Sequence, residues 1–316
     1  MGAGENFLIL NFLDDYFEAA LLRTDFSKKN LVLISLEKEN YESRDKFKKI
    51  FRRAFPMRSY KVILALDSKR AFTGHWNVSL VRDNREGKVT QADLENFVSR
   101  AIWKVFDNGR KMSGSQLGLN DADSLLVDTR IYDFKIDGRR VIDPLKHDGG
   151  KFDVSLSQTF TSRLFMEQMR SMLPKRAKLA FIVESGVAAS RLLSHMDNKK
   201  NFIFAKVMKD ETDIFISKKE RKNPEEDRSF VSFLDYFEWG ANDFYRDLGK
   251  EIAAEPEIAE AIAETFFTKE LSLALERRLE NILSEKMMTL NRGLANAATV
   301  AKCDLVYPER EFFIKL

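Results

Sequence analysis

Glycine is scarce in this chain, with 14 among 316 residues. That share is about 4%, against roughly 7% in an average protein. Enzymes that hold nucleotide phosphates with backbone N–H groups need glycine where the backbone comes close to the phosphate. The shortage therefore counts against a backbone cradle for a nucleotide, and no glycine at all follows Gly293.

Cysteine and histidine are also rare. The single cysteine, Cys303, excludes an internal disulfide and is typical of a reducing cytoplasm. We expect it to be a buried small residue, because no nucleophile motif surrounds it. The three histidines, His75, His147 and His195, fit no zinc-binding spacing. Since nucleotide-binding and serine-hydrolase motifs are missing as well, the sequence predicts no metal site, no cofactor and no catalytic residue.

Long apolar runs and a charge excess are missing too. No run approaches the roughly 20 apolar residues that span a bilayer, and the N-terminus lacks the features of a signal peptide. The 52 basic and 49 acidic residues leave a net charge of +3, whereas nucleic-acid-binding proteins usually show a stronger excess. We expect the basic clusters at 48–53 and 218–222 to be solvated. The chain is predicted to be cytoplasmic, to bind no nucleic acid and to reach a membrane only indirectly.

The first part of the chain alternates between strands and one helix. Apolar runs predict strands at 7–12, 17–23, 31–36 and 62–66. Between the last two, residues 41–55 have the spacing of a helix that Ser43 caps.

A strand–helix–strand–strand unit follows. It comprises a strand near 78–82, a helix at 88–106, and strands at 124–138 and 151–160. Thr90 and Asp93 form a capping box at the start of the helix. The polar segment 108–123, which contains three glycines, is predicted to be a loop.

The last part of the chain repeats the plan of the first. A helix at 161–173, a strand at 178–185 and a short helix at 186–195 lead to a hairpin at 202–218, and a strand and helices follow it. "NFLIL" at Asn6–Leu10 opens the first hairpin and "NFIFA" at Asn201–Ala205 opens the second. Two halves that each begin with a hairpin and continue with helices predict a duplicated α/β fold. The apolar stripe at 271–287 is expected to pack inside the second half rather than on a membrane.

The segment Gly138–Ser162 resembles the bacterial cell-division protein family FtsA, within the actin-like ATPase superfamily. The matching residues are Asp137, Gly138, Ile142, Asp143, Pro144 and Gly150. The segments "KVTQADLENFVSRA", "FIVESGVAASRLL" and "WGANDFYRDL" are similar to further family motifs. The resemblance implies a duplicated actin-like (ribonuclease H-like) α/β fold with an inserted subdomain of the SHS2 type. The implied domains are 1–72 and 161–198 for the N-terminal half, 73–160 for the insert, and 199–316 for a C-terminal half that is possibly truncated.

The two phosphate-binding hairpins of the family have lost their glycines here. In the first, Asn11, Leu13 and Asp14 stand at the motif positions. In the second, "KVMKDETDI" replaces a glycine-rich run, which puts Met208, Asp210, Thr212 and Asp213 at its positions. Side-chain bulk blocks close approach of the backbone, and carboxylates repel phosphate oxygens. We therefore expect that ATP is neither bound tightly nor hydrolysed, that Asp213 is a structural residue near a turn rather than a magnesium ligand, and that Lys206 is a solvated charge at a strand end.

The resemblance implies a scaffold in a cell-division assembly, which works by protein contacts and by self-association, with filaments as one form of it and an FtsZ-like tail as one partner. The implied location is the cytoplasm, with the inner face of the membrane reached only through a partner. One alternative is an adaptor of a pilus or secretion machine similar to PilM, which binds a peptide of that machinery. Another is a divergent FtsA that still binds ATP.

Overall fold

The computed structural model describes most of the chain in two units. The described residues are 5–13, 16–25, 30–40, 50, 60–82, 87–173, 177–196, 201–219, 229–267, 277, 279, 281, 287–303 and 305–308. The chain divides into compact units at Met1–Ser185 and Gly186–Leu316. It is a mixed α/β protein, and the described residues form three sheets. Among the described helices, none is long and apolar enough to cross a membrane.

The first unit contains a five-stranded sheet. Its strands are β1 (Asn6–Phe12), β2 (Tyr16–Asp25), β3 (Asn30–Asn40), β4 (Lys61–Leu66) and β9 (Lys178–Glu184), in the order β3-β2-β1-β4-β9. β1 to β3 form an antiparallel meander, whereas β4 lies parallel to β1 and β9 lies parallel to β4. The strands predicted here are confirmed. The predicted helix at 41–55 lies outside the described residues except for Ile50, which is helical and buried.

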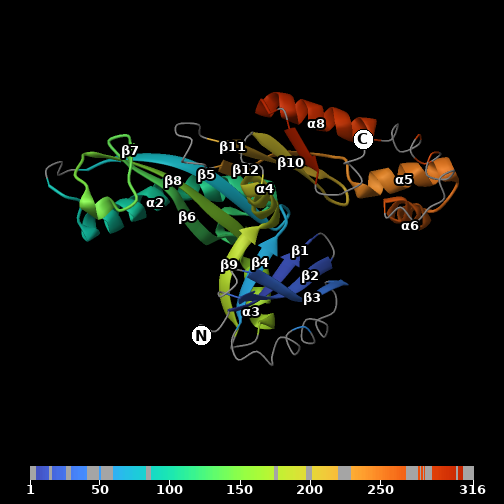
Figure 1. Ribbon diagram of the computed structural model, residues 1–316, viewed down its shortest axis with the longest axis horizontal. Helices are drawn as coiled ribbons and strands as arrows, with labels where there is room; N and C mark the ends of the chain where they lie inside the picture. The colour runs from blue at the N-terminus through green and yellow to red at the C-terminus, as the bar shows by residue number, and fades with distance from the viewer. Residues whose placement is uncertain are drawn as a thin grey trace. The chain divides into compact units, whose positions relative to one another are not determined.

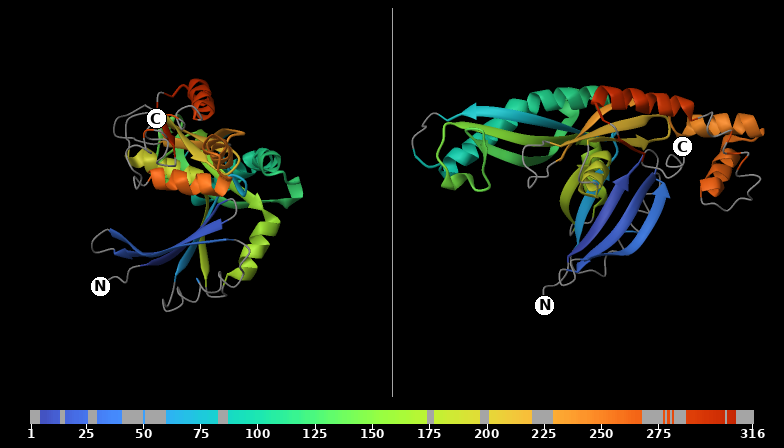
Figure 2. Two further views of the ribbon diagram at one scale, coloured as in Figure 1. Left: turned by 90° about the vertical axis from the view of Figure 1, so that its right-hand side faces the viewer. Right: turned by 45° about the horizontal axis from the view of Figure 1, so that its top comes forward.

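One face of this sheet carries the first core. Alternate residues of β1, namely Leu8, Leu10 and Phe12, are buried while their neighbours are partly exposed, as expected of a sheet with one covered face. Helix α3 (Arg163–Met172) contributes Met166 and Met169 to the same cluster, and Figure 2 shows it beside the sheet.

In the first unit one strand, a long helix and three further strands follow one another, and the four strands form a second sheet. It is built from β5 (Ala71–Val81), β6 (Ser124–Ile136), β7 (Arg139–Arg140) and β8 (Lys151–Ser162), in the order β5-β8-β6-β7 with antiparallel neighbours. Short 3₁₀ turns lie at Asp121–Asp123 and Pro144–Lys146. Helix α2 (Gln91–Leu117) covers one face through Phe97, Ala101 and Val105, and runs along the strands in Figure 1.

The predicted loop at 108–123 is wrong over most of its length, because α2 continues to Leu117. One of its glycines, Gly109, allows the helix to approach the sheet instead of ending it. A Cβ on Gly109 would stand 2.6 Å from the ring of Phe160. Gly114 and Ser113 are buried as well, and Ser113 hydrogen-bonds Ser124 at the start of β6. The helix ends where Gly118 adopts a left-handed backbone with φ 63°.

The second unit contains a four-stranded sheet with helices on both faces. Its strands are β10 (Phe202–Val207), β11 (Thr212–Lys219), β12 (Ser229–Phe237) and β13 (Leu305–Pro308), in the order β12-β11-β10-β13. β10 to β12 form an antiparallel meander and β13 lies parallel to β10. The order and directions therefore repeat those of β3-β2-β1-β4 in the first unit.

Alternate residues of β10 enter two different cores. Phe202 and Phe204 pack with Val187 of helix α4 (Ser185–Met196). Ile203, Ala205 and Val207 pack on the other face, in a cluster to which helices α5 (Ala241–Ile252), α6 (Pro256–Phe267) and α8 (Met288–Ala301) contribute. Most of the predicted helix at 271–287 lies outside the described residues.

The predicted capping box at the start of α2 is confirmed and extended by an arginine. The Thr90 hydroxyl accepts the Asp93 N–H at 3.1 Å, and Asp93 Oδ2 accepts the Thr90 N–H at 3.0 Å. Arg82 adds an ion pair of 2.8 Å to the same carboxylate. The hydrogen bonds from Thr90, backbone first, and then the charge of Arg82 hold the pKa of Asp93 below its usual value of 3.8.

Asp93→Asn should lower stability at neutral pH and have little effect in acid. A carboxyl whose pKa is lower in the folded state stabilises the fold above its unfolded pKa, and this contribution is lost as the pH falls through the folded value. We expect a lower urea midpoint for the variant at pH 7, and a midpoint that converges with that of the wild type as the pH falls below 3.8, the usual pKa of the carboxyl. Glu95→Gln, on the same helix but outside the capping box, is the control. A difference that persists unchanged in acid contradicts the assignment.

Candidate functional site

The first candidate hairpin joins β1 to β2, and two hydrogen bonds within the hairpin hold its end. The side chain of Asn11 donates to Glu18, directly opposite on β2, at 3.1 Å. The Leu13 N–H donates to the Tyr16 carbonyl at 2.9 Å. Asp14 lies outside the described residues. At Leu13, the backbone N–H that a phosphate would need is already used to close the turn.

The loop after β4 is joined to the end of this hairpin. The Asp67 N–H donates to the carbonyl of Phe12 at 3.1 Å. Asp67 is fully buried and forms an ion pair of 2.5 Å with Arg70. The carbonyl of Arg70 in turn accepts the Thr161 hydroxyl at 2.6 Å. These bonds connect β1, β4 and β8 within the first unit.

The second candidate hairpin joins β10 to β11, and its turn is closed by its own backbone. The Met208 N–H donates to the Glu211 carbonyl at 2.8 Å. Met208 is buried, whereas Asp210 is exposed. The residues at the two central positions of the turn are therefore Lys209 and Asp210, where glycine is usual.

The turn lies against the N-terminus of α5. The Ala241 N–H donates to the Met208 carbonyl at 2.9 Å, and the Asn242 N–H donates to the Lys209 carbonyl at 2.8 Å. The Asn242 side chain adds a bond of 2.9 Å to Asp210. The first N–H groups of a helix have no partner inside the helix. Here two of them are satisfied by carbonyls of the turn.

Gly240 makes this contact possible. It precedes α5 in an ordinary extended conformation, with φ −139° and ψ −173°. A Cβ at this position would stand 2.3 Å from the carbonyl oxygen of Lys209 and 2.5 Å from the backbone nitrogen of Asp210. Because both atoms belong to the backbone, they cannot rotate away. The Gly240 N–H donates to Asp243 at 3.0 Å, which completes the start of the helix.

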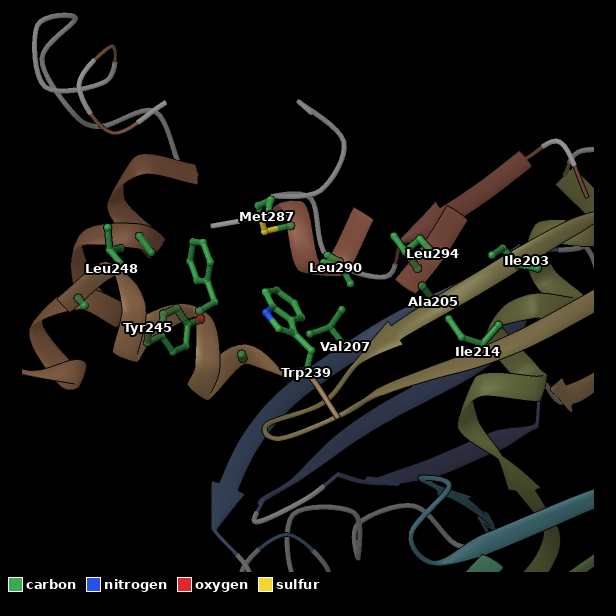
Figure 3. Close-up of a cluster of buried hydrophobic side chains, with 14 of the residues drawn as sticks. Ile203, Ala205, Val207, Ile214, Trp239, Tyr245, Leu248, Met287, Leu290 and Leu294 are labelled. Atoms are coloured by element: carbon green, nitrogen blue, oxygen red, sulfur yellow. The ribbon is translucent and has the colours of Figure 1, made fainter. Parts of the chain in front are cut away.

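Trp239, which precedes α5 and belongs to the hydrophobic core, also contacts the end of this hairpin. The buried Thr212 hydroxyl donates to the carbonyl of Trp239 at 2.7 Å. Trp239 itself belongs to the hydrophobic cluster around β10, and Figure 3 shows its indole beside Val207, the last residue of that strand. The hairpin end is thus attached to the segment before α5 by backbone, hydroxyl and apolar contacts.

The expectation that Lys206 is solvated is wrong, since it is only 1% exposed. β10 has cores on both faces, so a residue near its end is still covered. Asp213, also 1% exposed, is directly opposite Lys206 on β11. Side chains at directly opposite positions of an antiparallel pair share a face of the sheet, so two opposite charges are buried on one face.

The described residues contain no group of three or more His, Cys, Asp or Glu that could hold a metal ion. The two candidate hairpins lie in different units, and each is closed by its own hydrogen bonds. Sequence reasoning missed Gly240 and Asn242. The signal was present in "WGAND", where a glycine three residues before an aspartate marks a helix start.

Comparisons with known proteins give low-similarity structural matches. No protein-family model and no curated protein matches the chain. Among solved structures, the PilM–PilN type IV pilus biogenesis complex is similar over 96% of this chain and 88% of the other, with 12% identity and a TM-score of 0.48. A Bacteroides thetaiotaomicron protein with an actin-like ATPase fold and unknown function covers 79% and 78%, with 12% identity and a TM-score of 0.33. The cytoplasmic domain of EpsL, from the type II secretion system of Vibrio cholerae, covers 72% and 71%, with 10% identity and a TM-score of 0.34. With TM-scores below 0.5, these likenesses assign no activity to the chain.

Gly240→Ala should release the turn of the second hairpin from α5. The added methyl group meets backbone atoms, so the turn has to move and the bonds from Ala241 and Asn242 lengthen. We expect a loss of about 1–3 kcal/mol in the free energy of unfolding by urea. Asn242→Ala is the control: it removes one exposed side-chain bond, and should cost about 1 kcal/mol or less. Equal stability of Gly240→Ala and the wild type would contradict the close contact.

Proposed function

We propose that this chain is a non-catalytic adaptor with a duplicated actin-like fold, which works by binding proteins rather than by turning over ATP. The repeated sheet topology supports the duplicated fold. In each unit an antiparallel meander of three strands is extended by a parallel fourth strand next to the first.

The second sheet of the first unit supports an inserted subdomain of the SHS2 type. Its residues that resemble FtsA hold one turn together. Asp137 and Gly138 have positive φ values of 47° and 77° between β6 and β7. The Asp137 carboxylate accepts the N–H groups of Gly150 at 3.2 Å and Lys151 at 2.8 Å, which fixes the start of β8. These residues support the FtsA-type reading of the fold, while the domain boundaries stay a prediction.

The proposal that the chain neither binds ATP tightly nor hydrolyses it rests mainly on the contact between the second hairpin and α5. A helix N-terminus is a favourable place for an anion because its N–H groups point outward. In this chain the carbonyls of Met208 and Lys209 accept two of those N–H groups. Side chains replace the glycines that a backbone cradle needs, and Asp210 and Glu211 put negative charge on the turn. This arrangement favours a permanent internal contact over a phosphate.

Two kinds of assembly follow from the resemblance. In the first, the chain is a scaffold of cell division that acts in the cytoplasm and binds an FtsZ-like tail. In the second, it is an adaptor of a pilus or secretion machine that binds a peptide of that machine. Both need a binding surface and no turnover, so the two roles differ in the partner alone.

Addition of ATP should leave the stability of the full chain unchanged. A ligand that binds only the folded state raises stability by about 2.7 kcal/mol at 100 times its dissociation constant. We expect no shift of the melting temperature with millimolar ATP and magnesium, and no saturable signal with a fluorescent ATP analogue. A rise of several degrees that ADP or ATP produces and magnesium alone does not would overturn the proposal.

Peptide binding should distinguish the two assemblies. We expect a labelled C-terminal tail of an FtsZ-like protein to give a saturable rise in fluorescence anisotropy, and a short peptide from a pilus inner-membrane protein to give none. Scrambled peptides of the same composition are the controls. The reverse result assigns the chain to a pilus or secretion machine, and failure of both peptides contradicts both roles.

A further inference from the structure

Two buried serine hydroxyls of the second unit have no hydrogen-bond partner among the described residues. Ser190 on α4 and Ser217 on β11 are both 0% exposed, and the Oγ atom of each is shielded from solvent. Buried polar groups in native proteins are nearly always hydrogen-bonded, either to protein atoms or to ordered water. Because a hydroxyl that is buried without a partner is unfavourable, these two atoms indicate that a further polar group lies beside them.

Ser190 belongs to a stripe of small residues on α4. Gly186, Ser190 and Ser194 recur every four residues, which places them on one side of the helix, and all three are buried. A Cβ on Gly186 would stand 2.0 Å from the ring of Phe215 on β11, so this side of α4 faces the sheet. The Ser190 hydroxyl does not bond back to a carbonyl of its own helix, as a helical serine often does. It therefore needs a partner from outside the helix.

Ser217 faces the same helix from the sheet. It is directly opposite Phe202 on β10 and Val231 on β12. Both of those residues pack in one cluster with Val187 of α4. Side chains at directly opposite positions of antiparallel strands share a face of the sheet, so the Ser217 hydroxyl lies on the α4 side.

The geometry of helix and strand brings the two hydroxyls to the same part of this interface. Ser190 is one helical turn beyond Gly186, about 6 Å along the helix axis. Ser217 is two residues beyond Phe215, about 7 Å along β11. Only five residues separate the end of α4 from the start of β10 at Phe202, so α4 runs towards the end of the sheet at which Phe202 and Ser217 pair. From the contact of Gly186 with Phe215, helix and strand therefore lead in the same direction to the two serines.

We propose that one buried water molecule lies between α4 and β11 and bridges the hydroxyls of Ser190 and Ser217. A buried water typically makes about three hydrogen bonds to polar groups that have no other partner, and a serine hydroxyl can both donate and accept. Such a bridge is nearly as favourable as a direct hydrogen bond. Both hydroxyls are neutral, which favours water over an ion. The site lies inside the second unit and is independent of the proposed adaptor role.

A crystal structure of the full chain in which ordered waters are visible tests the site directly. We expect density for one water within hydrogen-bond distance of both Oγ atoms, and none at that place in the double variant Ser190→Ala/Ser217→Ala. Hydroxyls that bond protein atoms instead, or a contact between α4 and β11 that contains no water, overturn the proposal.

Urea unfolding of the alanine variants gives a second test. Ser190→Ala and Ser217→Ala should each lower the midpoint, and the double variant should be about as stable as the less stable single variant, because one substitution already breaks the bridge. Ser194→Ala is the control on the same side of α4, and its effect should add to that of Ser217→Ala. A midpoint that either single substitution leaves unchanged or raises shows a hydroxyl that was buried without a partner. Additive losses for Ser190→Ala and Ser217→Ala show two separate sites, and either of these results overturns the proposal.

Discussion

The N-terminus of α5 supplies hydrogen-bond donors, and the turn of the second hairpin supplies the carbonyl acceptors for them. The first N–H groups of a helix need acceptors, and the carbonyls of Met208 and Lys209 provide them. The contact is close because Gly240 has no side chain. Through Thr212 and Trp239 it continues into the hydrophobic cluster that α5, α6 and α8 share with β10. The position of the hairpin end therefore depends on the fold of its own unit and needs no ligand.

The glycines of the chain lie where the protein packs closely. Neither candidate hairpin turn, 13–15 or 208–211, contains a glycine. Glycine stands at Gly240, where backbone meets backbone, and at Gly186, where a Cβ would stand 2.0 Å from the ring of Phe215. Gly109 likewise faces the ring of Phe160. At these positions glycine allows close packing inside the protein. A few glycines are enough for this purpose, so the low glycine content is compatible with it.

Periodicity was sufficient to find most strands, because alternating burial along β1 and the apolar run of β4 are local properties. It failed where tertiary contacts determine the secondary structure or the burial of a residue. The glycines of segment 108–123 are typical of a loop, yet Gly109 lets α2 lie against the sheet and only Gly118 ends the helix. Lys206 reads as a solvated charge until both faces of β10 are known to be covered. Of the candidate site, the sequence located the two hairpins, but the contact between Met208 and Ala241 joins residues far apart in the chain and leaves no periodic trace.

The charges of the second hairpin give a further reason why it suits an internal contact. The hairpin end contains two lysines, Lys206 and Lys209, and three carboxylates, those of Asp210, Glu211 and Asp213. Asp213 is buried, where charge interactions are weakly screened. A triphosphate at this turn would meet a segment with one more carboxylate than lysines, and two of the carboxylates, Asp210 and Glu211, belong to the turn itself. The buried lysine opposite Asp213 offsets that carboxylate within the protein, so it is not available to neutralise an anion from solution. Steric, hydrogen-bonding and electrostatic effects at this hairpin are thus all unfavourable for binding a triphosphate.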